Sequence, residues 1–88
     1  MYHVKFMDCA SENRNKLREL LKQFKSEEGM EVIGAFYPRG SEYMFASVTK
    51  YDDYATWEKK WASSSKTRQE GINIITKQMD MFFEKINL

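Results

Sequence analysis

The sequence predicts an α+β domain in which four strands form an antiparallel sheet and two helical regions cover one of its faces. Two observations lead to this prediction: a strand–helix–strand pattern occurs twice along the chain, and the predicted strands are apolar on both sides. The chain has 88 residues, the length of one domain, which we place at residues 1–88. A chain of this size buries only about 60–65% of its unfolded surface, which favours a core shared with a second copy.

The first strand and the first helix have clear patterns. Residues 2–8 alternate between apolar and more polar side chains, which predicts a strand. An amphipathic helix is expected over residues 11–28, because leucines recur there at helical spacing. Ser11 is a suitable N-cap, and Gly29 can end the helix in the left-handed conformation.

The middle of the chain predicts an antiparallel hairpin. Strands are expected over residues 31–37 and 43–49, each with apolar side chains on both faces. Between them the sequence reads Pro-Arg-Gly-Ser over residues 38–41, and its proline and glycine favour a turn with Arg39 at the exposed tip.

A second helical region follows, and we expect it to consist of two pieces. Asp52 or Asp53 can cap the first piece. Three large aromatic side chains share one stripe of this piece, namely Tyr54, Trp57 and Trp61. The Ala-Ser-Ser-Ser run at residues 62–65 is poor helix interior and predicts a break.

The end of the chain completes the pattern. Thr67 and Glu70 can form a capping box for the second helical piece. The apolar stripe of this piece is expected to consist of Ile72, Ile75 and Met79. Residues 81–86, with large apolar side chains on both faces, are predicted to form the fourth strand.

The order strand–helix–strand–strand–helix–strand, with right-handed crossovers, predicts the ferredoxin-like arrangement with both helices on one face of the sheet. The other face would then expose a large apolar patch, which monomers avoid. Two copies that cover this face for each other would close an eight-stranded barrel with the helices outside. We therefore expect a homodimer.

Composition excludes several function classes. The net charge is +1, with both signs interspersed, which argues against nucleic acid and a polybasic membrane anchor. His3 and Cys9 are the only residues of their kinds, so one chain has neither an internal disulfide nor a Cys/His zinc cluster. No apolar run is long enough for a membrane span. We expect a cytoplasmic protein without a membrane partner, metal or cofactor.

Two segments resemble a known superfamily. The sequence FASVTKYDDYATW at residues 45–57 is similar to a strand that enters an aromatic helix in the dimeric α+β barrel superfamily, and WASS at residues 61–64 is similar to the helix break that follows. The resemblance is to its antibiotic biosynthesis monooxygenase-like and NIPSNAP-like groups. Members include cofactor-independent oxygenases, haem-degrading enzymes and isomerases, so the resemblance implies a dimeric barrel but no single reaction.

The resemblance also implies a pocket between the sheet and the second helix. Trp57 and Trp61 would line it, with Tyr54 and Met44, and would suit a flat apolar or aromatic ligand. The alternative is that this aromatic stripe is simply the core face of an amphipathic helix, which the pattern alone favours. In the haem-degrading members of the superfamily a histidine follows the aromatic helix. The second half of this chain contains no histidine, so haem degradation is disfavoured.

Three polar residues near the N-terminus are candidates for chemistry. His3 can act as a general base, or it can be a structural residue. Lys5 shares its strand face; if buried it needs a carboxylate such as Glu84, and otherwise it extends to the rim. Cys9 precedes the first helix, whose dipole lowers a thiol pKa, although a buried inert thiol is the favoured interpretation.

The expected function is the binding of a small apolar or aromatic molecule by a homodimer. If the protein is an enzyme, a metal-free, monooxygenase-like oxidation with His3 as the base is the leading reaction class. The alternative is a non-catalytic dimerisation or ligand-sensing module in which the aromatic residues only pack.

Overall fold

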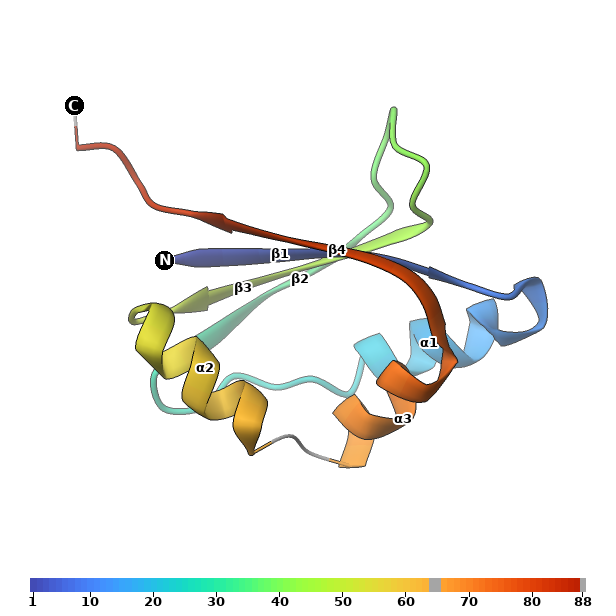
Figure 1. Cartoon of the computed structure of the whole chain (residues 1–88), viewed down its shortest axis with the longest axis horizontal. Coiled ribbons are helices and arrows are strands. Elements are labelled where there is room, and N and C mark those ends of the chain that lie inside the picture. Colours follow the sequence, from blue (N-terminus) through green and yellow to red (C-terminus); the bar gives the residue numbers. More distant parts are fainter. Residues whose placement is uncertain (64–65, 88) are drawn as a thin grey trace.

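A computed structural model describes residues 1–63 and 66–87, with the backbone alone for residues 66 and 67. It confirms an α+β fold with a four-stranded antiparallel sheet, which Figure 1 shows above the helices. Its elements are β1 (Tyr2–Cys9), the short 3₁₀ helix η1 (Ser11–Asn13), α1 (Arg14–Leu21), β2 (Met30–Phe36), β3 (Phe45–Tyr51), α2 (Tyr54–Ala62), α3 (Lys66–Ile74) and β4 (Ile75–Phe83).

The sheet has the strand order β2-β3-β1-β4, and all of its neighbouring strands are antiparallel. This order is consistent with the ferredoxin-like fold expected from the sequence. The helices lie on one side of the sheet (Figure 1), and the molecule has dimensions of 42 × 31 × 17 Å. One side of the sheet is therefore covered by helices and the other is not.

The hydrophobic core lies between α1 and the sheet. Met7 of β1, Leu17 of α1 and Phe45 of β3 are almost completely buried and pack in one cluster with Leu21. Met7 is directly paired with Phe45 across the β1–β3 ladder, and directly paired residues face the same side of a sheet. The core therefore occupies one end of the space between the layers, which leaves room elsewhere.

The first helix is shorter than predicted. It ends at Leu21 rather than near residue 28, and Ser11 begins a 3₁₀ turn instead of capping an α-helix. Residues after Leu21 are bound to β2: Ser26 Oγ accepts a hydrogen bond from the Val32 amide at 2.8 Å, and Glu27 forms a bridge with Met30. These tertiary hydrogen bonds outweigh the helix propensity of the segment, because tertiary contacts readily override propensity.

The hairpin and the second helix agree with the predictions. β2 and β3 pair antiparallel, Gly40 in their connection has φ +69°, and Arg39 is exposed beside it. Asp53, one of the two proposed caps, accepts a hydrogen bond from the Thr56 amide at 2.7 Å. The helical region does consist of two pieces, α2 and α3. The proposed Thr67–Glu70 capping box depends on the side chain of Thr67, which lies outside the described part of the chain. Ser64 and Ser65 of the predicted break also lie outside it.

The fourth strand begins earlier than predicted. β4 covers Ile75–Phe83, so Ile75 and Met79 belong to a strand and not to the helical stripe assigned to them. The strand pairs with β1 along its length, from Ile75 opposite Cys9 to Phe83 opposite Tyr2. Pairing ends there because β1 begins at Tyr2, so the predicted continuation to residue 86 has no partner strand.

The uncovered side of the sheet, which we call the open face, is apolar. Val4 of β1 is paired with Val48 of β3 and with Met81 of β4, and all three face away from the helices. On the edge strand β4, Met79, Met81 and Phe83 are 40%, 38% and 45% exposed. The open face also includes Phe6, which is paired with Met79.

Candidate functional site

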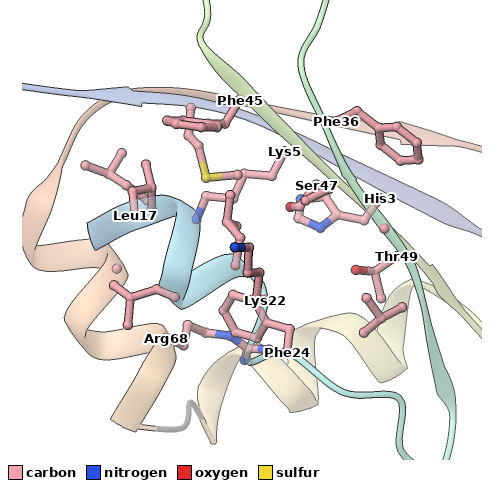
Figure 2. Close-up of a pocket in the computed structure, with 18 of the residues that line it drawn as sticks. His3, Lys5, Leu17, Lys22, Phe24, Phe36, Phe45, Ser47, Thr49 and Arg68 are labelled. Carbon is pink, nitrogen blue, oxygen red and sulfur yellow. The ribbon is translucent and has the colours of Figure 1, made fainter. Parts of the chain in front are cut away.

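A cavity of about 470 Å³ lies between the sheet and the helices. Strands β1, β2 and β3 supply one wall, and α1, α2 and α3 supply the other. Figure 2 shows His3, Lys5, Ser47 and Thr49 on the sheet side, with Arg68 on the helical side. This volume is within the range of small-molecule sites. It extends beyond the predicted pocket under the second helix, because α1 and α3 also contribute.

Gly71 shows that part of this space is empty. It is buried in the middle of α3 and lines the cavity, yet a Cβ atom built on it would meet none of the described residues within 4 Å. A buried helical position normally contacts neighbouring side chains in a close-packed interior. The wall at Gly71 therefore borders open space rather than packed protein.

His3 and Asp80 form a hydrogen-bonded pair at the sheet wall. His3 Nε2 lies 2.7 Å from Asp80 Oδ1, and the histidine is only 7% exposed. The hydrogen bond from His3 lowers the pKa of Asp80, the charges of His3 and Lys5 lower it further, and burial opposes them. An ionised Asp80 accepts the proton of Nε2, so the neutral ring has its lone pair at Nδ1. Nδ1 is then the atom that can take up a proton.

Aromatic rings surround the histidine. The His3 ring stacks on Phe82 of β4 at a centroid distance of 4.9 Å and lies 5.6 Å from the Trp57 ring and 6.3 Å from the Tyr51 ring. Phe82 also contacts Trp57 edge-on at 4.7 Å. These contacts fix the orientation of the imidazole next to the cavity.

Trp57 and Trp61 form a stacked pair on α2. Their ring centroids are 6.2 Å apart and their planes differ by 15°, and both residues line the cavity. α2 contains no fully buried side chain, although its stripe was predicted from the pattern to be a core face. The two tryptophans therefore border the cavity as well as packing against each other.

Two cations lie over the Trp61 ring. Lys5 Nζ is 5.0 Å from its centroid, and the guanidinium carbon of Arg68 is 5.7 Å from it. Arg68 Nη1 also donates a hydrogen bond to the Lys60 carbonyl at 2.7 Å. Burial lowers the pKa of Lys5, Asp80 raises it and Arg68 lowers it again. The pKa of Lys5 is therefore lowered overall, because the surroundings of the ammonium group partly oppose its charge.

The structure brings together some of the residues proposed from the sequence but not all of them. His3, Trp57 and Trp61 line the cavity. Tyr54 contacts Trp57 and Phe82 but is half exposed and does not line it. Met44 packs against the hydrophobic core instead.

The surroundings of Cys9 agree with the favoured expectation, whereas those of Lys5 differ from it. Cys9 is 5% exposed, and burial, followed by the charge of Asp8, raises the pKa of its thiol, which agrees with the favoured interpretation of an inert thiol. Lys5 is paired across the ladder with Asp80, whereas its proposed partner Glu84 lies beyond the end of β4.

Sequence reasoning missed Asp80, Arg68 and Gly71. Asp80 was not considered because the fourth strand was expected to begin at Met81. It is the one acidic residue in the apolar run from Met79 to Phe83, and a lone charge in a strand pattern could have indicated it. Nothing in the sequence distinguishes Arg68 or Gly71.

Comparisons with known proteins add no identification. The sequence matches no family model and no curated protein, and the fold matches no solved structure. Among the described residues, no three His, Cys, Asp or Glu side chains come together as metal ligands. None of the helices in this part of the chain has the length and apolar character needed to cross a membrane.

Asp80→Asn is expected to lower the free energy of unfolding at pH 7 by about 1–3 kcal/mol, because it replaces a charge-assisted hydrogen bond from His3 with at most a neutral one. The folded-state pKa of Asp80 is depressed, so its contribution is present above its usual value of 3.8 and is lost as pH falls through the folded value. Urea unfolding at pH 7 and pH 3 should therefore show a difference between variant and parent that shrinks in acid.

Glu84→Gln is the matched control for Asp80→Asn, because Glu84 is exposed and lies outside the sheet. It is expected to leave the free energy of unfolding within about 0.5 kcal/mol of the parent. Equal stabilities of Asp80→Asn and Glu84→Gln at pH 7 would contradict the importance of the His3–Asp80 pair.

Proposed function

We propose that this protein binds a small apolar or aromatic molecule in the cavity between its two layers, and that His3 acts on the molecule as a general base. The observation that carries the proposal is the cavity itself, with the stacked Trp57 and Trp61 on one wall and His3, which is hydrogen-bonded to Asp80, on the other. Stacked aromatic side chains favour a flat ligand, and an imidazole fixed by a carboxylate favours proton transfer.

The proposed base acts through a single proton transfer. His3 Nδ1 takes a proton from an acidic C–H or O–H bond of the ligand, and the electron pair of that bond stays on the ligand as an enolate or phenolate. Asp80 holds the ring through Nε2 and stabilises the imidazolium that forms. The resemblance to cofactor-independent oxygenases adds the proposal that dioxygen then reacts with this anion.

We also propose that the protein is a homodimer joined through the open face, as in a dimeric α+β barrel. The chain exposes 6117 Å², whereas a monomer of this mass exposes about 5,400 Å². In one copy, the four strands are spaced about 4.8 Å apart and are about 25 Å long, so together they offer an open face on the order of 500 Å². Two copies would therefore bury about 1,000 Å² between them. That area is close to the threshold of about 1,000 Å² expected of a biological interface.

A substitution at Gly71 tests ligand binding without removing any polar group. Gly71→Leu is expected to fill the cavity and to weaken the binding of a neutral bicyclic probe, 2-naphthamide, at least tenfold in isothermal titration calorimetry. The fold should not suffer, because glycine in a helix interior is less favourable than leucine by up to about 1 kcal/mol. Gly71→Ala, which adds only one carbon, is the control and should retain binding.

The two outcomes of this test are distinct. Loss of binding in Gly71→Leu, with binding retained in Gly71→Ala, supports a ligand site at this position. Absence of binding of bicyclic aromatic probes to the parent protein, whether neutral or anionic, would contradict the proposal and favour the alternative of a non-catalytic packing module. A separate experiment tests the role of His3. It measures the protein-catalysed deuterium exchange of the α-hydrogens of 2-tetralone in D₂O, and His3→Gln should abolish this catalysis.

A further inference from the structure

Among the described residues, the acidic and basic side chains that line the cavity are all basic, and the nearest carboxylate, Asp80, lies behind His3. Of the described residues that line it, four are basic, namely Lys5, Arg18, Lys22 and Arg68, and none is Asp or Glu. The chain as a whole has nearly equal numbers of acidic and basic residues, 13 and 14, so this lining differs from the average surface. A cavity lined by one sign of charge attracts the opposite sign.

The four basic side chains differ in their contact partners and in their positions in the cavity. Lys22 is paired with Glu19 at 2.9 Å on the exposed side of α1. Arg18 donates hydrogen bonds to Tyr37 and Asn15 at 2.7 Å, also at the exposed surface. Lys5 and Arg68 lie deeper, over the Trp61 ring, between the sheet and α3.

The ammonium group of Lys5 lies where a charge lowers the stability of the fold unless a partner offsets it. The side chain extends from an inner strand, and Asp80, the carboxylate opposite it, already accepts a hydrogen bond from His3. Burial acts most strongly against its charge and Arg68 adds to this effect, while Asp80 offsets only part of it, so the pKa of Lys5 is lowered. A charge kept in such a place is typical of a functional site, where a ligand of opposite charge offsets the cost.

We propose that the ligand of this cavity is an aromatic anion, whose rings lie against Trp57 and Trp61 and whose carboxylate or ionised oxygen lies at Lys5 and Arg68. This inference rests on the proposed function, because it names the chemical class of the molecule bound there. The same two cations also stabilise the enolate or phenolate that His3 produces, since fixed positive charge at a developing anion lowers the barrier to its formation.

Two probes of the same shape test the proposal. 2-Naphthoate and 2-naphthamide have the same rings and differ in the charge of one group. Isothermal titration calorimetry at pH 7 is expected to show that the parent protein binds naphthoate at least tenfold more tightly than naphthamide. In Lys5→Met this preference should fall to about one, with the affinity for naphthamide changed less than twofold.

Arg68→Gln is a second variant, needed if Lys5→Met does not fold, and it should also reduce the preference at least threefold. Lys16→Met is the matched control, because it removes the same charge from the exposed side of α1 and should change neither affinity. Equal binding of the two probes by the parent would overturn this inference and leave the proposed function standing. A preference that survives both cavity variants would also overturn it, and failure of both probes to bind would overturn the proposed function with it.

Discussion

Met81→Lys is expected to convert the proposed homodimer into monomers. Met81 lies on the open face, 38% exposed, next to Val4 in the sheet. Burial of an unpaired ammonium group between two apolar sheets is costly, and two-fold symmetry makes each dimer bury two of them. A loss of about 4 kcal/mol corresponds to a dissociation constant about a thousandfold higher.

Sedimentation velocity at micromolar concentration measures this effect. The parent protein should sediment at twice the chain mass of 10.5 kDa, and Met81→Lys at the mass of one chain. Ala55→Lys is the matched control, because Ala55 is exposed on α2, in the layer opposite the open face, and the variant should remain dimeric. A parent protein that sediments as a monomer would remove the barrel from the proposal, while the cavity, which lies within one chain, would remain.

Leu17→Ala is expected to cost about 3–5 kcal/mol of unfolding free energy, the largest loss we expect from truncating a single side chain. Leu17 is 1% exposed and packs with Met7, Leu21 and Phe45. Its removal creates a void whose lining loses dispersion contacts, in addition to the lost burial of the side chain. For a small domain this is a large part of the total stability.

Leu17 also lines the cavity, so the same variant reports on the ligand site. The new void joins the existing space, and 2-naphthamide should raise the melting temperature of Leu17→Ala if it occupies that space. Thermal unfolding with and without the probe measures both effects. Ile86→Ala, at a side chain that is 76% exposed, should unfold like the parent; a similar midpoint for Leu17→Ala would contradict the core described above.

The sequence predicted those parts of the site that depend on local patterns. The spacing of Trp57 and Trp61 places them on one stripe of a helix, and this spacing held because Asp53 caps the helix locally. The strand carrying His3 was predicted from its alternation, which depends only on the pleat of the chain. Each of these features is determined by residues a few positions apart.

The structure was needed for contacts between distant segments. His3 and Asp80 are 77 positions apart, and their pairing depends on the register of β4 against β1. The start of β4 at Ile75 follows from that register, because cross-strand partners outweighed the helical spacing of Ile72, Ile75 and Met79. A residue's strand partner is a property of the assembled sheet, and a single sequence has no local signal for it.

The sequence alone therefore determined the order of the elements, the hairpin, the choice of Asp52 or Asp53 as a helix cap and the apolar character of the open face, because short-range periodicity and turn chemistry encode them. Tertiary structure decided where α1 ends, which carboxylate faces His3 and Lys5, and that Gly71 borders an empty space. These depend on the packing of one layer against the other, where a hydrogen bond such as that from the Val32 amide to Ser26 outweighs local preference.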